Sequence, residues 1–105
     1  MRAGRLDRRV TIERSIETQD DYGAPVQTWS VVAVVFAEKR DIRARERFAA
    51  EQDIGEETTV FVIRWLDGVT TKHRLRCEGK TYNIEGIAEV GRREGLEITA
   101  TAQGV

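Results

Sequence analysis

The sequence is poor in cysteine, histidine and proline. Its 105 residues include one cysteine, one histidine and one proline. The cysteine, Cys77, cannot form an intramolecular disulfide, and it lies in an alternating apolar pattern with no second thiol beside it. We therefore interpret Cys77 as a small core residue, because free cysteine is among the residues most often buried.

Motifs for metal binding and catalysis are also missing. The single histidine, His73, lies in a polar stretch, so we expect an ordinary exposed side chain rather than a metal ligand. Acidic residues are numerous, but none belongs to a motif that would desolvate it for acid–base work. The glycines match no phosphate-binding pattern. We expect no enzymatic activity, no catalytic residue, no cofactor and no metal.

The sequence contains no long uncharged apolar run. It therefore predicts no membrane span and no signal peptide, and we expect a protein made and kept in a cytosol. Its 17 basic and 18 acidic residues nearly cancel, so no overall field marks a nucleic-acid or membrane binder. The charges are nevertheless segregated by segment. Residues 1–10 and 39–47 are net basic, whereas residues 51–57 carry acids and no base.

The segment Thr58–Leu66 is the clearest strand signal. It contains β-branched and aromatic residues without glycine or proline, and both of its alternating faces are mostly apolar. A strand of this kind belongs in the middle of a sandwich or small barrel. We predict that five of its side chains are buried: Val60, Phe61, Val62, Ile63 and Trp65.

Further alternating segments predict the other strands. We expect a hairpin loop over Ser15–Thr28, a bend or bulge near Val31–Ala33, and a bulge or a close backbone approach at Gly86. Trp29 and Phe36 also fall in core-like patterns. The additional predicted strands are Arg9–Glu13, Gln27–Glu38, Leu75–Glu78, Lys80–Ile87 and Leu96–Thr101.

The segment Arg40–Gln52 changes character. It is rich in good helix formers, and Asp41 is placed to cap a helix N-terminus, so we predict a short helix there. The whole chain, 1–105, is then a single β domain, with a flexible N-terminal arm at 1–8 and a helix/loop insert at 39–57. The predicted fold class is mainly β: a small antiparallel β-barrel or sandwich of about six strands with one short helix in an inserted loop.

Several short motifs occur in an order and spacing that resemble the phage head-tail joining family, the head-closure or stopper connectors of long-tailed phages and phage-like gene transfer agents. Where such proteins often have a Ser-Gly break in the insert, this chain has Asp41-Ile42-Arg43-Ala44. The matching residues are Gly4, Leu6, Arg9-Val10-Thr11-Ile12, Asp21-Tyr22-Gly23, Trp29, Phe36-Ala37-Glu38, Arg45-Glu46, Ile63-Arg64-Trp65, Gly79 and Tyr82-Asn83-Ile84.

The resemblance implies a structural virion component in the neck of a phage or phage-like particle, assembled in the bacterial cytoplasm. Its expected partners are other copies of itself in a homo-oligomeric ring, a portal-adaptor protein on the head side, tail terminator or tail proteins on the other side, and DNA passing non-specifically through the lumen; no membrane is involved. The resemblance also places the insert toward the channel, where it would line or close it.

The interface or channel candidates follow from that placement together with the segregated charge. The alternative for these residues is a solvated charged surface. The candidates are Lys39, Arg40, Arg43, Arg45, Glu46, Arg47, Glu51, Asp53, Glu56 and Glu57 in the insert, and Arg2, Arg5 and Arg8 in the N-terminal arm.

Two other functions are considered. A small host β-barrel binding module for peptide or nucleic acid would need an exposed patch of aromatic and basic residues, whereas the aromatic residues here fall in core-like patterns. A small hydrolase is the more remote alternative, because no catalytic motif is present.

Overall fold

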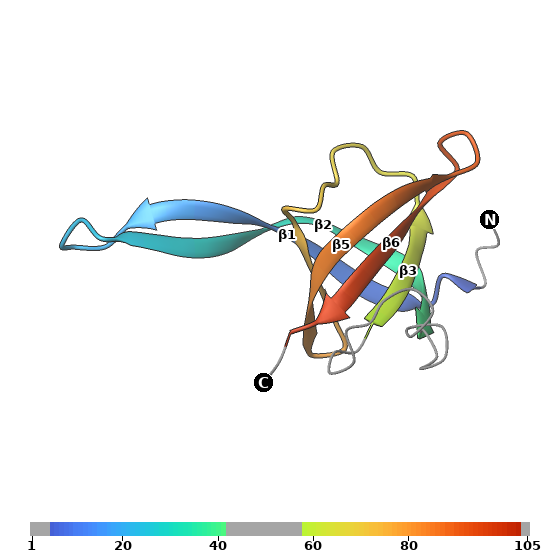
Figure 1. The fold of residues 1–105 in the computed structure, drawn as a ribbon, viewed down its shortest axis with the longest axis horizontal. Coiled ribbons are helices and arrows are strands. Elements are labelled where there is room, and N and C mark those ends of the chain that lie inside the picture. Colours follow the sequence, from blue (N-terminus) through green and yellow to red (C-terminus); the bar gives the residue numbers. More distant parts are fainter. Residues whose placement is uncertain (1–4, 42–57, 104–105) are drawn as a thin grey trace.

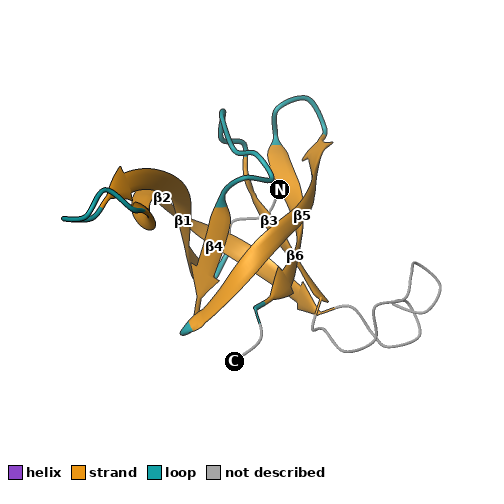
Figure 2. Cartoon of the chain, turned by 60° about the vertical axis from the view of Figure 1, so that its left-hand side comes forward, coloured by secondary structure: helices purple, strands orange, loops and turns teal. Residues whose placement is uncertain are grey.

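The computed structural model describes residues 5–41 and 58–103, which form a closed antiparallel sheet and a long protruding hairpin (Figure 1). No α-helix occurs within these ranges, and all of their extended regular structure is strand (Figure 2). Six strands lie within these ranges, in agreement with the prediction of about six: β1 (Arg8–Gln19), β2 (Pro25–Asp41), β3 (Thr58–Arg64), β4 (Arg74–Cys77), β5 (Lys80–Val90) and β6 (Gly95–Ala102).

The sheet closes into a barrel in the order β1-β2-β3-β6-β5-β4, and every neighbouring pair is antiparallel. Closure follows from β1, which pairs with β2 along its whole length and with β4 over Val10 to Glu13. β3 lies between β2 and β6. Its predicted central position is therefore confirmed.

The barrel interior is filled by one apolar cluster. Val10, Ile12 and Phe61 are fully buried in it, and Cys77 is also buried, as the sequence predicted. The rings of Phe61 and Tyr82 meet edge to face, with centroids 5.0 Å apart and planes at 81°. Such a contact stabilises an aromatic pair beyond its area burial, by about 0.5–1.5 kcal/mol.

The burial prediction for β3 is correct at three positions and wrong at two. Phe61, Val62 and Ile63 are buried, whereas Val60 and Trp65 are only partly buried. Val60 alternates with the inward-pointing Phe61, so its side chain lies on the outer side of the closed sheet. Trp65 follows the last residue of β3, where the chain leaves the barrel wall.

The core-like patterns of Trp29 and Phe36 were also misleading. Phe36 is 58% exposed on the outer face of β2, and Trp29 is only partly buried. In a closed sheet one of two apolar faces must point outward, and an alternating sequence does not say which one. The sequence-based argument against an exposed aromatic patch therefore fails.

The loop predicted over Ser15–Thr28 is much shorter in the structure. β1 and β2 continue as a two-stranded ribbon, and only residues 20–24 form the turn. We call residues 14–30 the hairpin arm; it projects from one side of the barrel (Figure 1). The Asp20 carboxylate accepts hydrogen bonds from the backbone N–H groups of Tyr22 and Ala24, each at 2.9 Å. Gly23 supplies a φ of 82°, which a side chain would disfavour.

Both predicted irregularities are present. Ile12 pairs with Ala33 and Glu13 with Val31, so Val32 is an extra residue in β2. The second bulge lies between Ile84 and Gly86 in β5. The first bulge occurs where the hairpin arm leaves the barrel, and bulges of this kind bend a strand and increase its twist.

The predicted helix is wrong for its first two residues. Arg40 and Asp41 belong to β2, where they pair with Val60 and Thr59. The Asp41 carboxylate accepts a hydrogen bond from the Thr59 hydroxyl at 3.3 Å, so the ladder to β3 continues where we expected a helix cap. The remainder of the predicted helix, residues 42–52, lies outside the described residues.

Candidate functional site

β2 presents an unusually apolar outer surface. Val31, Val32, Val34 and Phe36 are all exposed, and we call these four residues the β2 apolar stripe. Between residues 25 and 36, β2 pairs only with β1 among the described strands, because its ladder to β3 begins at Ala37. A row of apolar side chains beside an unpaired strand edge is typical of a surface that contacts another protein.

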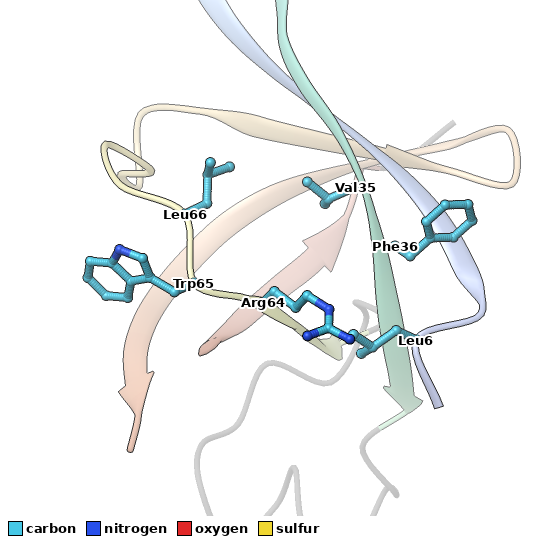
Figure 3. A pocket seen from close by; sticks show the side chains of 6 residues that line it. All are labelled: Leu6, Val35, Phe36, Arg64, Trp65 and Leu66. Carbon is cyan, nitrogen blue, oxygen red and sulfur yellow. The ribbon is translucent and has the colours of Figure 1, made fainter. Parts of the chain in front are cut away.

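A pocket of about 400 Å³ opens beside one end of this stripe (Figure 3). Its apolar walls come from β2, from the segment that follows β3, and from the chain that precedes β1. The backbone N–H of Trp65 donates to the carbonyl oxygen of Glu94 at 3.2 Å, which ties this segment to the turn between β5 and β6. We call it the Trp65 pocket; its lining residues are Leu6, Val35, Phe36, Arg64, Trp65 and Leu66.

Basic side chains surround the Trp65 pocket. Arg64 lines it and is exposed, and the Arg93 guanidinium carbon lies 5.5 Å from the centre of the Trp65 ring. Arg9 lies opposite Phe36 in the backbone ladder between β1 and β2, and its side chain is exposed. Within residues 5–41 and 58–103, neither Arg9 nor Arg64 forms an ion pair. The rim therefore carries positive charge that the described part of the chain leaves uncompensated.

The base of the hairpin arm is held by a partly buried ion pair. Arg74 Nε donates to Glu13 Oε1 at 2.7 Å, and the Arg74 guanidinium carbon lies 4.1 Å from the centre of the Trp29 ring. The Glu13 side chain is buried although it carries a carboxylate. Arg74 and Trp29 cover it. The three residues connect β1, β2 and β4 at the point where the arm leaves the barrel.

The tip of the hairpin arm is acidic and carries one exposed aromatic ring. Tyr22 is 96% exposed, the most exposed of the large hydrophobic residues described. Glu17, Asp20 and Asp21 lie close to it, and the sequence has no lysine or arginine between Arg14 and Lys39. Beyond Arg14 at its base, the arm therefore bears negative charge without a counter-charge of its own.

Oppositely charged side chains form ion pairs at the barrel end where β2 stops at Asp41 and β3 begins at Thr58. Arg40 Nε lies 2.8 Å from Glu38 Oε2, and Arg40 Nη1 lies 3.8 Å from Glu97 Oε2. The hydrogen bond from Arg40 lowers the pKa of Glu38, although burial acts in the other direction. The same hydrogen bond raises the pKa of Arg40. Lys39 is half-buried in the same strand.

The described candidates of the N-terminal segment behave differently from each other. Arg5 is exposed, and its charge helps to lower the pKa of Glu38. Arg8 begins β1, and its Nη1 lies 3.0 Å from Glu78 Oε1 in the turn between β4 and β5. Its Nε also lies 3.9 Å from Asp7 Oδ1.

The structure brings Lys39, Arg40 and Arg5 to one region of the barrel, while Arg8 pairs with Glu78. The other predicted site residues lie outside the described residues: Arg2, Arg43, Arg45, Glu46, Arg47, Glu51, Asp53, Glu56 and Glu57. Sequence reasoning missed the β2 apolar stripe, the Trp65 pocket and Tyr22. Two signals pointed to them: both faces of Val31–Phe36 are apolar, and Tyr22 is an aromatic residue within an acidic turn.

The described residues show few features of chemical catalysis. They contain no group of three His, Cys, Asp or Glu side chains placed to hold a metal ion, and no helix long and apolar enough to span a membrane. His73 is half-buried, and its Nδ1 accepts a hydrogen bond from the Thr70 N–H at 3.0 Å. Burial raises the pKa of the Cys77 thiol, with a further contribution from the Glu78 charge.

A closed β-barrel with a protruding arm and an exposed apolar stripe has the features of a structural protein that works through contacts with other proteins. Comparison with protein families makes this specific. The chain belongs to the phage head completion protein family, whose family model matches residues 1–103. It is a structural component of a phage or phage-like virion, and the family predicted from the sequence is confirmed.

Solved structures agree with the fold. The solution structure of protein SF1141 from Shigella flexneri 2a matches with a TM-score of 0.77 and 25% identity, over 97% of this chain and 96% of that one. A chain of the virion of a native gene transfer agent particle matches with a TM-score of 0.66 and 23% identity, over 92% and 94% of the two chains. A search of functionally curated proteins gives no match.

Proposed function

We propose that this chain is a head–tail connector subunit. Copies of it assemble into a ring that joins the portal and its adaptor to the tail, and the ring surrounds the channel through which DNA passes. Membership of the phage head completion protein family is the observation that carries this proposal. The exposed β2 apolar stripe and the Trp65 pocket support it, since a ring subunit needs surfaces that its neighbours can cover.

The insert is the part of the chain that we propose lines or closes the channel. Its first three residues, 39–41, continue β2, and the rest follows Asp41 and precedes Thr58; Asp41 pairs with Thr59, so both points lie at the same end of the barrel. In the proposed ring the basic residues at 39–47 face the acidic residues at 51–57 of the next subunit. Arginines not used between subunits contact DNA phosphates weakly and without reading sequence.

The charge balance supports a sliding contact with DNA. The chain has a net charge of −1, so it lacks the strong positive field of a protein that holds DNA tightly. A ring of such subunits lets DNA pass, while a few arginines at the lumen keep it centred. A near-neutral net charge would weaken the binding of a protein that has to capture DNA from solution.

The host binding-module alternative has one observation in its favour, because Phe36 is exposed and two tryptophans lie beside arginines. The tryptophans do not form an open stacking platform, however. Each has one ring face covered by an arginine of the same chain, Arg74 for Trp29 and Arg93 for Trp65. The family match favours the virion role instead.

The proposal is tested in particles whose own copy of this gene is deleted and replaced on a plasmid. Without the protein we expect heads that package DNA but lose it and carry no tail. With Arg45→Glu and Arg47→Glu combined, we expect a folded subunit with unchanged melting and particles that fail to retain DNA, measured as nuclease-protected DNA per head. Arg76→Glu, an exposed charge reversal on β4, is the matched control and should restore retention.

Two outcomes would contradict this proposal at different levels. Tailed, DNA-containing particles made without the protein would remove the connector function altogether. Normal DNA retention by the double arginine variant would leave the connector function in place but exclude the insert as its working part.

A further inference from the structure

The hairpin arm carries acidic residues and an exposed tyrosine at its tip, and the Trp65 pocket has an apolar wall with exposed arginine beside it. We propose that the arm tip of one subunit docks in the Trp65 pocket of the next subunit, with Tyr22 as the anchor. This inference rests on the proposed ring, and it adds the residues through which neighbouring copies recognise each other.

The positions of the two surfaces fit a head-to-tail contact. The arm projects from one side of the barrel, whereas the end of β3 and the start of β1, which border the Trp65 pocket, lie on the opposite side (Figure 1). The arm of a subunit therefore points away from its own pocket. A contact between two different surfaces repeats from copy to copy and forms a closed ring when the rotation between subunits permits it.

The arm tip is built as a rigid anchor. The Asp20 carboxylate holds the N–H groups of Tyr22 and Ala24, and the backbone adds two bonds of 3.0 Å within the turn, from Asp20 N to Ala24 O and from Gly23 N to Asp20 O. Tyr22 is presented on this turn almost fully exposed. A turn whose backbone is already ordered loses little backbone entropy on binding, and tyrosine is a frequent interface anchor.

The Trp65 pocket suits such a ring. Its volume of about 400 Å³ falls within the range of roughly 300–1,000 Å³ typical of pockets that hold small aromatic ligands. Leucine, valine and aromatic side chains form most of its wall (Figure 3). The exposed Arg64 at its edge is available to the phenol oxygen or to an acidic neighbour of Tyr22.

The charges on the two surfaces are opposite. The arm carries Glu17, Asp20 and Asp21, and the pocket is bordered by Arg9, Arg64 and Arg93. Acids also lie near the pocket: Glu38 is hydrogen-bonded to Arg40, Asp67 follows Leu66 in the chain, the Glu89 carboxylate accepts a hydrogen bond from the Arg93 N–H at 2.9 Å, and Glu94 follows Arg93. Arg9 and Arg64 form no ion pair within the described residues, so these two guanidinium groups are the ones available to an acidic partner.

The unpaired edge of β2 offers a second contribution. It begins at Phe36, which itself lines the pocket, and continues toward the arm. An incoming hairpin that places its tip in the pocket brings its own backbone alongside this edge. Main-chain hydrogen bonds made there would add affinity, as they do in other cases of strand addition.

The decisive experiment replaces Tyr22 with the photo-cross-linking amino acid p-benzoylphenylalanine in assembled particles. Irradiation is expected to produce a ladder of covalently linked copies of this chain, with adducts mapped by mass spectrometry to Leu6, Trp65 or Leu66. The matched control carries the same amino acid at Arg76 on β4 and should give no adduct at those residues. Adducts to another virion protein, or none in particles that assemble, would overturn the inference.

A parallel treatment with an amine-reactive cross-linker separates the two proposals. If that reagent links copies into a ring while position 22 gives no self-adduct, the ring stands and the arm contact is wrong. If neither treatment links copies of this chain, the ring itself is wrong.

Charge reversal gives an independent test. Asp21→Arg and Arg64→Asp should each reduce the yield of DNA-retaining particles by about tenfold, and the combination should recover most of the loss. Asp21 is chosen because, unlike Asp20, it makes no hydrogen bond within the described turn that holds the tip. Equal losses in the double variant and the single variants would show that these two residues do not meet.

Discussion

The barrel and the hairpin arm share two strands, β1 and β2, but differ in almost every physical respect. In the barrel, β1 has a partner on each side and contributes fully buried side chains such as Val10 and Ile12. In the arm, β1 and β2 pair only with each other among the described strands, and no side chain of residues 14–28 is buried. The comparison shows that the buried core belongs to the barrel, whereas the arm keeps its side chains largely exposed.

The arm depends on the barrel for its order. An isolated two-stranded ribbon is at best marginally stable in water, since it has no face to bury. Here the ion pair of Glu13 with Arg74, and the Trp29 ring beside it, fix the direction in which the ribbon leaves the sheet. Separate tests of core, base and charge can therefore break or sharpen the distinction between the two regions.

The largest effect is expected in the core. Phe61→Ala removes a fully buried ring that packs on Tyr82, so the free energy of unfolding should fall by roughly 3–5 kcal/mol through lost burial and a cavity. Chemical denaturation measures this loss. Val34→Ala on the outer face of β2 is the control and should cost less than about 0.5 kcal/mol. A loss below about 1 kcal/mol for Phe61→Ala would show that β3 is not central to stability.

An intermediate effect is expected at the base of the arm. Arg74→Ala leaves the buried Glu13 carboxylate without its donor, which should cost about 2 kcal/mol. Amide exchange in residues 14–30 should become faster, while barrel amides change only with global stability. Arg76→Ala, two residues further along the same strand and exposed, is the control. Unchanged exchange in the arm would mean that Arg74 does not hold it.

The smallest effect concerns a titration. The hydrogen bond from Arg40 lowers the pKa of Glu38, so the folded state gains stability above the unfolded pKa of that carboxyl and loses it as pH falls through the folded pKa. Arg40→Gln should move the pKa of Glu38 upward and shift that loss to higher pH. Carbon-detected NMR titration of Glu38 measures the change. An unaltered pKa in the variant would show that Arg40 does not contact Glu38 in solution.

Much of the barrel could be predicted from the sequence because its strands carry a buried face. The alternation of Leu96, Ile98 and Ala100 marks β6 directly, and Gly86 marks the bulge in β5. A strand with one buried face alternates apolar and polar residues, so its position can be predicted from the sequence. The family could be predicted for a different reason, namely the order of short motifs along the whole chain.

The arm and the pocket could not be predicted in the same way. Residues 15–28 bury neither face, so no alternation distinguishes their ribbon from a loop. The Trp65 pocket is formed by Leu6, Phe36 and Trp65, which are far apart in the sequence and meet only when the sheet closes. Trp29 falls in a core-like sequence pattern, but in the structure Arg74 from β4 covers one face of its ring. Local sequence does not reveal this contact.

The extra residue at Val32 has a consequence for the protein before it reaches a particle. The run Val31 to Phe36 is uncharged, β-branched and free of proline, which is the composition of segments that stack into fibrils, and it lies along an unpaired edge. The bulge interrupts the regular hydrogen-bonding pattern of that edge, and Pro25 removes a donor at its far end. The bulge and Pro25 therefore make this edge of a free subunit a poor template for indiscriminate strand pairing.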